Sequence, residues 1–341
     1  MDKPKPNSKN LLWLQSGGCG GCTASLLGAE SPDFLTAFET GGINILWHPS
    51  ISIETGGQVS DIFKAILNGQ IKLDILCLEG SVIKGPGGTG KFHMVSGGQG
   101  HSMMELIEQL AGLADYVVGV GTCAAFGGVT ASGDNQVEAC GLAFDNDQKG
   151  GLLGDDFSSN KDLPVVNIPG CPVHPDWVTE TLLHLASGNM TAEHLDHLGR
   201  PVTISGHLVH HGCARNEYYE YKASARRLSE LGCMMENLGC KGTQAAGDCN
   251  KRSWNGSGSC ISGGYPCIAC TEPGFEDPGH PFVETPKIAG IPVGLPTDMP
   301  KAWFVALASL SKAATPQRLR VNAVSDYLKV MPARNPGRKS K

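Results

Sequence analysis

The strongest constraint on this chain is the way its cysteines are grouped. It has 13 cysteines in 341 residues, and most of them fall at the short spacings that are typical of metal ligands. One compact group lies near the C-terminal end of the chain and consists of Cys249, Cys260, Cys267 and Cys270. Four thiolates are what a cubane iron–sulfur cluster requires, so this group predicts a 4Fe-4S site.

Composition and charge narrow the class of protein further. The net charge of -6 gives no support to a nucleic-acid-binding surface, which would be strongly basic. The N-terminal residues contain no apolar signal core and no twin-arginine pair, and no apolar run approaches the roughly 18 residues of a membrane span. We therefore expect a cytoplasmic protein with no membrane anchor and no nucleic-acid partner. In a reducing cytosol, metal binding explains so many cysteines better than disulfides do.

Short apolar runs recur through the first half of the chain and alternate with helix-like segments. The helix-like segments include 32–39, behind a cap at Ser31, and 102–114, which carries an apolar stripe. This alternation predicts an α/β domain with a doubly wound parallel sheet. The five apolar runs span residues 11–14, 43–47, 73–78, 116–120 and 165–168.

Three of these runs lead directly into cysteine motifs. The first is followed by Cys19 and Cys22, the fourth by Cys123 and the fifth by Cys171. Because the carboxyl ends of parallel strands meet at one edge of a sheet, we expect the four sulfurs to gather there. The sequence therefore predicts a second site with four thiolates.

From about residue 190 to 285 the strand signals disappear, which indicates a small irregular domain held together mainly by metal centres. A third ligand group lies here and consists of His210, Cys213, Cys233 and Cys240. Three thiolates and one imidazole suit a structural zinc as well as an iron–sulfur cluster. The two four-cysteine groups in the same chain favour a cluster. The expected domains are thus 1–189 and 190–285, followed by a C-terminal extension over 286–341.

Two further features are assigned structural roles. The segment 85–91 has the spacing of a phosphate-binding loop, but Phe92 stands where a hydroxyl would have to hold magnesium. We therefore expect a glycine loop whose backbone packs closely against a partner or a cofactor. Cys77 lies inside an apolar run and is expected to be a small buried core residue, and Cys140 is left unassigned.

Taken together, these motifs make nearly the whole chain resemble the small, electron-transferring subunit of nickel-iron hydrogenases. Within that family it is most similar to the cytoplasmic regulatory, hydrogen-sensing hydrogenases, on the segments 210–219 and 294–304. The segments that carry the family resemblance are Leu-Gln-Ser-Gly-Gly-Cys-Gly-Gly-Cys at 14–22, Gly-Thr-Cys-Ala-Ala-Phe-Gly-Gly at 121–128, Pro-Gly-Cys-Pro at 169–172, Leu-Gly-Cys-Lys-Gly at 238–242 and Pro-Cys-Ile-Ala-Cys-Thr-Glu-Pro at 266–273.

The resemblance implies a flavodoxin-like N-terminal domain and three 4Fe-4S clusters. Many relatives carry proline at the position of Cys260 and hold a three-iron medial cluster. An acidic residue faces the proximal cluster in the family, and Glu79 matches it; a proton relay and an ordinary hydrogen-bonded carboxylate both stay open for this residue. The implied ligands are Cys19, Cys22, Cys123 and Cys171 for the proximal cluster, Cys249, Cys260, Cys267 and Cys270 for the medial cluster, and His210, Cys213, Cys233 and Cys240 for the distal cluster.

The resemblance also implies a heterodimer whose nickel-iron site lies in a separate large subunit. Because this chain lacks the paired C-x2-C motifs that hold that metal, we expect no catalytic residue in it. The expected function is hydrogen sensing, in which electrons pass through the three clusters. A sensor histidine kinase is expected to bind through the C-terminal extension. A dimer of heterodimers is one conceivable assembly. The alternative is a cytoplasmic uptake hydrogenase that feeds a redox acceptor. A zinc-rich scaffold is disfavoured, since three coordinated sites exceed what a scaffold needs.

Overall fold

The computed structural model describes residues 8–95, 100–279 and 282–324, which divide into two compact units. Of the described residues, the first unit contains 8–95, 100–206, 254–256 and 270–278, and the second contains 207–253, 257–269, 279 and 282–324. This division differs from the expected boundaries at 189 and 285. Two short segments return to the first unit, and the C-terminal extension is grouped with the second.

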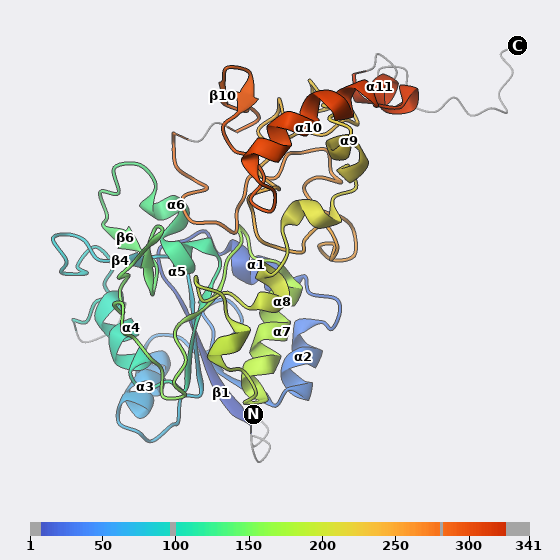
Figure 1. Cartoon of the computed structure of the whole chain (residues 1–341). Coiled ribbons are helices and arrows are strands. Elements are labelled where there is room, and N and C mark those ends of the chain that lie inside the picture. The colour runs from blue at the N-terminus through green and yellow to red at the C-terminus, as the bar shows by residue number, and fades with distance from the viewer. Residues whose placement is uncertain (1–7, 96–99, 280–281, 325–341) are drawn as a thin grey trace, which may run out of the picture. The chain divides into compact units, whose positions relative to one another are not determined.

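The elements of each unit appear in Figure 1. In the first unit the strands are β1 (Lys9–Gln15), β2 (Ile43–Trp47), β3 (Ile75–Glu79), β4 (Val82–Ile83), β5 (Tyr116–Val120), β6 (Ala139–Cys140), β7 (Phe144–Asp145), β8 (Gln148–Lys149) and β9 (Val166–Ile168). Its helices are α1 (Gly21–Leu27), α2 (Phe34–Thr40), α3 (Gly57–Leu67), α4 (Met103–Ala111), α5 (Thr122–Phe126), α6 (Gly128–Ala131), α7 (Pro175–Ala186) and α8 (Val202–Ser205), with a 3-10 turn at Ala192–His194. The second unit has a 3-10 turn at Val209–Gly212, α9 (Asn216–Glu220), β10 (Lys287–Ile288), β11 (Ile291–Pro292), α10 (Lys301–Ala313) and α11 (Gln317–Ala323).

The central sheet of the first unit confirms the predicted α/β fold. Its five parallel strands follow the order β2-β1-β3-β5-β9, and each coincides with one of the five apolar runs. In the register of this sheet Gln15 pairs with Glu79, Glu79 with Val120, and Val120 with Ile168. Four strands therefore end at the same edge of the sheet. In the sequence, the cysteine motifs come directly after three of these strand ends.

Helices cover both faces of the sheet (Figure 1). On one face Leu14 and Leu78 share a core with Phe63 of α3 and Leu110 of α4. On the other face α7 packs against α1 and α2. Burying a leucine or phenylalanine side chain contributes about 1.5–3 kcal/mol, so these contacts stabilise the row of strand ends. Cys77 is fully buried within β3, which agrees with its expected core position.

The starts of two helices show how local sequence selects their position. The carboxylate of Asp33 accepts a hydrogen bond from the Thr36 amide at 3.0 Å, so Asp33 caps α2 where the sequence had suggested Ser31. At α4, Ser102 and Glu105 form a reciprocal capping box.

The second unit has little regular structure. The described part of the chain contains no strand between β9 and β10. A small core forms around Val209, Met234, Leu238 and Ile261, with Cys267 inside it. Cys213, Cys240 and Cys249 pack against this core. Predicted ligands are thus part of the packing itself, as expected of a domain that metal centres hold together. Among the described residues, no helix combines the length and the apolar character that crossing a bilayer would require.

Candidate iron-sulfur sites

The first unit brings Cys19, Cys22, Cys123 and Cys171 together beyond the row of strand ends. Cys22 lies in the first turn of α1, Cys123 in the first turn of α5, and Cys171 follows β9. Burial raises the pKa of the Cys22 thiol, and charge on Glu79, Cys123 and Cys171 raises it further. Burial likewise raises the pKa of Cys171 to about 12, with contributions from Cys123 and Cys19. The four thiols therefore lie close enough to influence one another.

Gly121 lets two of these loops approach each other. Its φ of 84° lies in the left-handed region, and a Cβ added there would lie 2.4 Å from the sulfur of Cys22. Only glycine fits such a position without strain. The turn after β5 can therefore pass directly beside the sulfur carried by α1.

Glu79 anchors the start of α1. One carboxylate oxygen accepts the amide protons of Cys22 at 3.0 Å and Thr23 at 3.1 Å. The other accepts from the Thr23 hydroxyl, from Gln15 Nε2 at 2.9 Å and from Trp13 Nε1 at 3.3 Å. Through these contacts the Glu79 carboxylate positions the backbone of Cys22, a predicted ligand. A role of Glu79 in proton relay stays a hypothesis.

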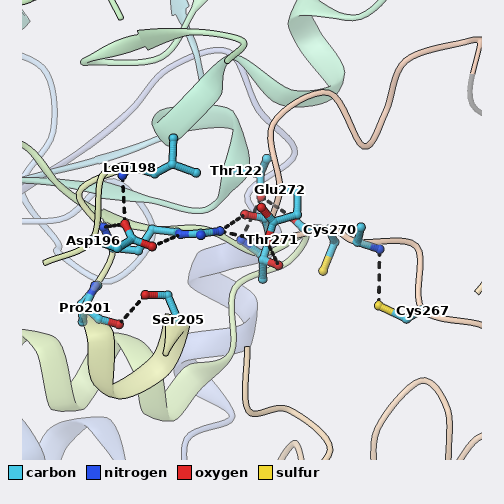
Figure 2. A network of polar contacts seen from close by, with 12 residues as sticks. Thr122, Asp196, Leu198, Pro201, Ser205, Cys267, Cys270, Thr271 and Glu272 are labelled. Atoms are coloured by element: carbon cyan, nitrogen blue, oxygen red, sulfur yellow. Dashed lines mark hydrogen bonds and ion pairs between the residues drawn. The ribbon is translucent and has the colours of Figure 1, made fainter. Parts of the chain in front are cut away.

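Thr122 joins three loops of the first unit (Figure 2). Its hydroxyl accepts a hydrogen bond from the Gly170 amide at 2.9 Å and donates one to the carbonyl oxygen of Cys270. Thr122 precedes Cys123, and Gly170 precedes Cys171. One side chain thus connects two proximal ligand loops to the segment that carries a predicted medial ligand. Sequence reasoning assigned Thr122 no role.

A buried arginine holds the same segment (Figure 2). The Arg200 guanidinium donates to Asp196 Oδ2 at 2.8 Å, to Glu272 Oε1 at 2.9 Å and to the Thr271 carbonyl at 3.3 Å. Hydrogen bonds to charged groups contribute about 1.5–3 kcal/mol. With the Thr122 contact, this network ties residues 270–272 to other parts of the first unit.

In the second unit, one cavity is lined by all four predicted distal ligands, His210, Cys213, Cys233 and Cys240. Burial raises the pKa of Cys233 to about 12, and it also raises the pKa values of Cys213 and Cys240. These thiols stay protonated at neutral pH, so a metal that binds them must displace their protons.

The two ring nitrogens of His210 differ in their partners. Its Nε2 lies 3.2 Å from a carboxylate oxygen of Asp298, whereas its Nδ1 is buried without a hydrogen-bond partner. An orphaned buried nitrogen is costly unless a ligand satisfies it. His210, His211 and Asp298 also place their ligand atoms within 4.8 Å of one another. Although burial opposes ionisation, hydrogen bonds from His211 and His210 lower the pKa of Asp298.

The predicted medial ligands are divided between the two units. Cys249, Cys260 and Cys267 belong to the second unit, and Cys270 belongs to the first. The Cys267 amide donates to the sulfur of Cys240 at 3.4 Å, which ties this group to a distal ligand within the second unit. Cys260 is exposed. The medial set as a whole stays a prediction.

The residues fit iron–sulfur clusters on the chemistry of their donors. A gathered set of four cysteines suits a cubane, and the close approach at Gly121 supports such a site. The distal set of three thiols and one unpartnered imidazole nitrogen suits a cluster and also a tetrahedral zinc.

The glycine loop at 85–91 has a structural explanation. The amides of Gly87 and Gly88 donate to the two carboxylate oxygens of Glu138 at 2.6 Å and 2.8 Å. A carboxylate therefore occupies the amides that would otherwise be available for a phosphate. Cys140, in β6, is buried.

Two family models match the chain. The model of the NADH ubiquinone oxidoreductase 20 Kd subunit matches residues 19–185. The model of the C-terminal part of the NiFe/NiFeSe hydrogenase small subunit matches residues 206–283.

Known hydrogenase small subunits and a solved hydrogenase structure match most of the length of this chain. An F420 non-reducing hydrogenase II small subunit from Methanosarcina mazei is 34% identical over 82% of this chain and 77% of its own length. The periplasmic [NiFeSe] hydrogenase small subunit of Desulfomicrobium baculatum is 33% identical over 80% and 86%, respectively. Among solved structures, the actinobacterial-type NiFe-hydrogenase from Ralstonia eutropha H16 superposes with a TM-score of 0.74 at 30% identity, covering 91% of this chain and 92% of that one.

These matches agree with the gathered cysteines and with the parallel sheet. Small subunits of this kind transfer electrons and partner with a separate large subunit. The chain therefore belongs to the small-subunit family of the nickel-iron hydrogenases.

Proposed function

We propose that this chain relays electrons through three 4Fe-4S clusters in a cytoplasmic, hydrogen-sensing hydrogenase. The proximal cluster is held by Cys19, Cys22, Cys123 and Cys171, the medial by Cys249, Cys260, Cys267 and Cys270, and the distal by His210, Cys213, Cys233 and Cys240. The observation that carries the relay is the gathering of two complete ligand sets, one in each unit; of their cysteines Cys19 is exposed and the others are partly buried.

When bound, the clusters would supply one-electron transfer. The chain's own residues hold and shield them. Glu79 and Thr122 fix the loops that carry proximal ligands, and partial burial limits the access of water to Cys22, Cys123 and Cys171. Hydrogen bonds and exposure at each site set its potential.

Metal analysis of the anaerobically purified heterodimer tests the relay. Besides the iron of the nickel-iron site in the large subunit, the complex should contain about twelve iron atoms and as much sulfide, four per cubane, with no stoichiometric zinc. About eight iron atoms with one zinc would instead make the group of His210, Cys213, Cys233 and Cys240 a structural zinc site. Nickel should be confined to the large subunit.

The sensing role rests on the resemblance of segments 210–219 and 294–304 to regulatory members. A second candidate is an uptake hydrogenase that feeds a redox acceptor. The relatives reported above are named as hydrogenases and their names do not mention sensing, so this candidate is kept beside the first.

Copurification distinguishes the two candidates. The tagged chain, isolated from its native cells, should recover the large subunit together with a histidine kinase. Recovery of the large subunit with a redox carrier protein, and no kinase, would favour the uptake function.

A further inference from the structure

Asp298 reaches the predicted distal ligand from far along the chain. It lies 88 residues beyond His210, and its Oδ2 is 3.2 Å from Nε2 of that imidazole. We propose that Asp298 is a positioning residue that fixes the tautomer of His210 and sets the potential of the distal site. This inference rests on the proposed function, because it takes His210 as a ligand.

The proton positions follow from the acceptors available. A neutral imidazole carries one N–H, and a carboxylate can only accept. His210 therefore carries its proton on Nε2, facing Asp298. Its Nδ1 keeps a free lone pair, and this nitrogen is the buried one without a hydrogen-bond partner. The carboxylate thus directs the one suitable nitrogen toward the cavity lined by the three cysteines.

The neighbouring His211 holds the carboxylate from a second side. Its Nδ1 lies 3.3 Å from the amide of Leu208, which donates to it, so the proton of His211 is on Nε2. That Nε2 lies 2.8 Å from the same Oδ2 of Asp298. Two imidazole N–H groups therefore converge on one oxygen, which fixes the position of the carboxylate.

The backbone around Asp298 is also fastened to the distal site. The Thr297 amide and hydroxyl both lie within hydrogen-bond distance of the Thr243 carbonyl, at 3.1 Å and 3.3 Å. Thr243 follows shortly after the ligand Cys240. The ring of Tyr219 packs edge-on against the ring of His210, with 5.0 Å between their centroids. The imidazole thus has its orientation set from two directions.

A carboxylate that accepts from a ligating histidine makes the imidazole a stronger electron donor. A more electron-rich ligand stabilises the oxidised state of the metal centre, so Asp298 should hold the distal potential down. Removing its negative charge should raise that potential. Removing the acceptor altogether should also weaken retention of the cluster, by roughly the 10–100-fold known for partners of metal ligands.

The test uses the complete heterodimer and a redox titration followed by electron paramagnetic resonance. Asp298→Asn keeps an acceptor oxygen but loses the charge, so the distal potential should rise with little loss of iron. Asp298→Ala should raise it further and lower the iron content. Asp298→Glu keeps the negative charge, so its distal potential should lie closer to that of the unmodified protein. As a matched control, Glu217→Gln removes an exposed carboxylate of the same unit that pairs with Arg318.

The outcomes separate this inference from the proposed function. The inference is wrong if the unmodified complex shows three clusters and Asp298→Asn has the same distal potential and spectrum as the unmodified complex and the Glu217→Gln control. Loss of iron in Asp298→Ala alone would then show only a structural role. If the unmodified complex holds zinc at the distal group, the relay proposal fails and this inference falls with it.

Discussion

At the residue scale, the environment of each imidazole decides its chemistry. His48 is buried, and its Nδ1 accepts the Ser50 amide proton at 3.1 Å, which leaves Nε2 to face the Thr23 hydroxyl at 3.4 Å. Burial lowers the pKa of His48 to about 4, although the Glu79 carboxylate acts in the opposite direction. His48 is therefore neutral in the folded protein near neutral pH, whereas the Nδ1 of His210 is buried without a hydrogen-bond partner and is the nitrogen proposed to bind the cluster.

The depressed pKa of His48 predicts an acid-sensitive step in stability. In the unfolded chain the pKa of His48 is about 6.5. The contribution of His48 to the free energy of unfolding is therefore fully present above that pH. It is lost as the pH falls from about 6.5 to about 4, because the unfolded state takes up a proton first. In cluster-loaded protein, His48→Gln should lose less unfolding free energy across this window than the unmodified chain. The exposed His197→Gln serves as control, and equal losses in all three proteins would contradict the prediction.

In the proposed medial site, Cys260 is the residue that would decide the type of cluster. The fourth thiolate allows a four-iron cubane, so Cys260→Pro should yield a three-iron cluster, visible by electron paramagnetic resonance after oxidation. Cys260 is exposed, so the substitution should perturb packing little. Cys140→Ser, at a buried cysteine outside the ligand sets, should leave the spectrum unchanged. A stoichiometric three-iron signal in the unmodified protein would show that the ligand assignment is wrong.

At the scale of elements, the ends of strands and the starts of helices place the ligands. The turn from β5 to α5 is paired with the turn after β9, because the Thr122 amide donates to the Gly170 carbonyl at 3.1 Å and the Thr122 hydroxyl accepts in return at 2.9 Å. Cys123 and Cys171 follow these two positions directly. The geometry of the proximal set thus depends on how two elements end.

Replacing Thr122 by valine keeps its shape but removes the hydroxyl. The Gly170 amide would lose its side-chain partner, which costs about 1–3 kcal/mol for a buried unsatisfied donor. The hydrogen bond from position 122 to the Cys270 carbonyl would also be lost. We expect a lower denaturation midpoint and an altered proximal spectrum for Thr122→Val. Thr122→Ser retains the hydroxyl and should behave like the unmodified protein. Equal stability of both variants would show that these hydrogen bonds contribute nothing.

At the scale of the whole molecule, the C-terminal extension begins as folded structure. Leu319 and Ala323 of α11 are buried against Ala223, and Arg318 forms an ion pair with Glu217. The extension is rich in basic side chains, and the sequence favours these as the contact with an acidic surface of the kinase. Two of them, Arg318 and Arg320, lie in α11. Lys329, Arg334, Arg338, Lys339 and Lys341 lie outside the described residues.

Truncation after Val324 therefore tests the kinase contact without removing α11. We expect loss of kinase association and of hydrogen-dependent gene expression, while hydrogen oxidation with an artificial dye persists. Truncation after Thr315 also removes Leu319 from its core, so it controls for the loss of folded structure. Normal kinase binding and signalling by the protein truncated after Val324 would exclude the tail as the contact.

The sequence by itself determined the five strands, the cysteine groups and the edge of the sheet where the proximal ligands gather. Each of these follows from local patterns, because apolar runs and closely spaced cysteines carry their meaning within a few residues. Only the tertiary structure decided which distant groups meet. The contacts of Asp298 with His210, of Thr122 with Cys270 and of Arg200 with Glu272 join residues 88, 148 and 72 positions apart. No periodicity links such residues, since their proximity depends on the path of the whole chain between them.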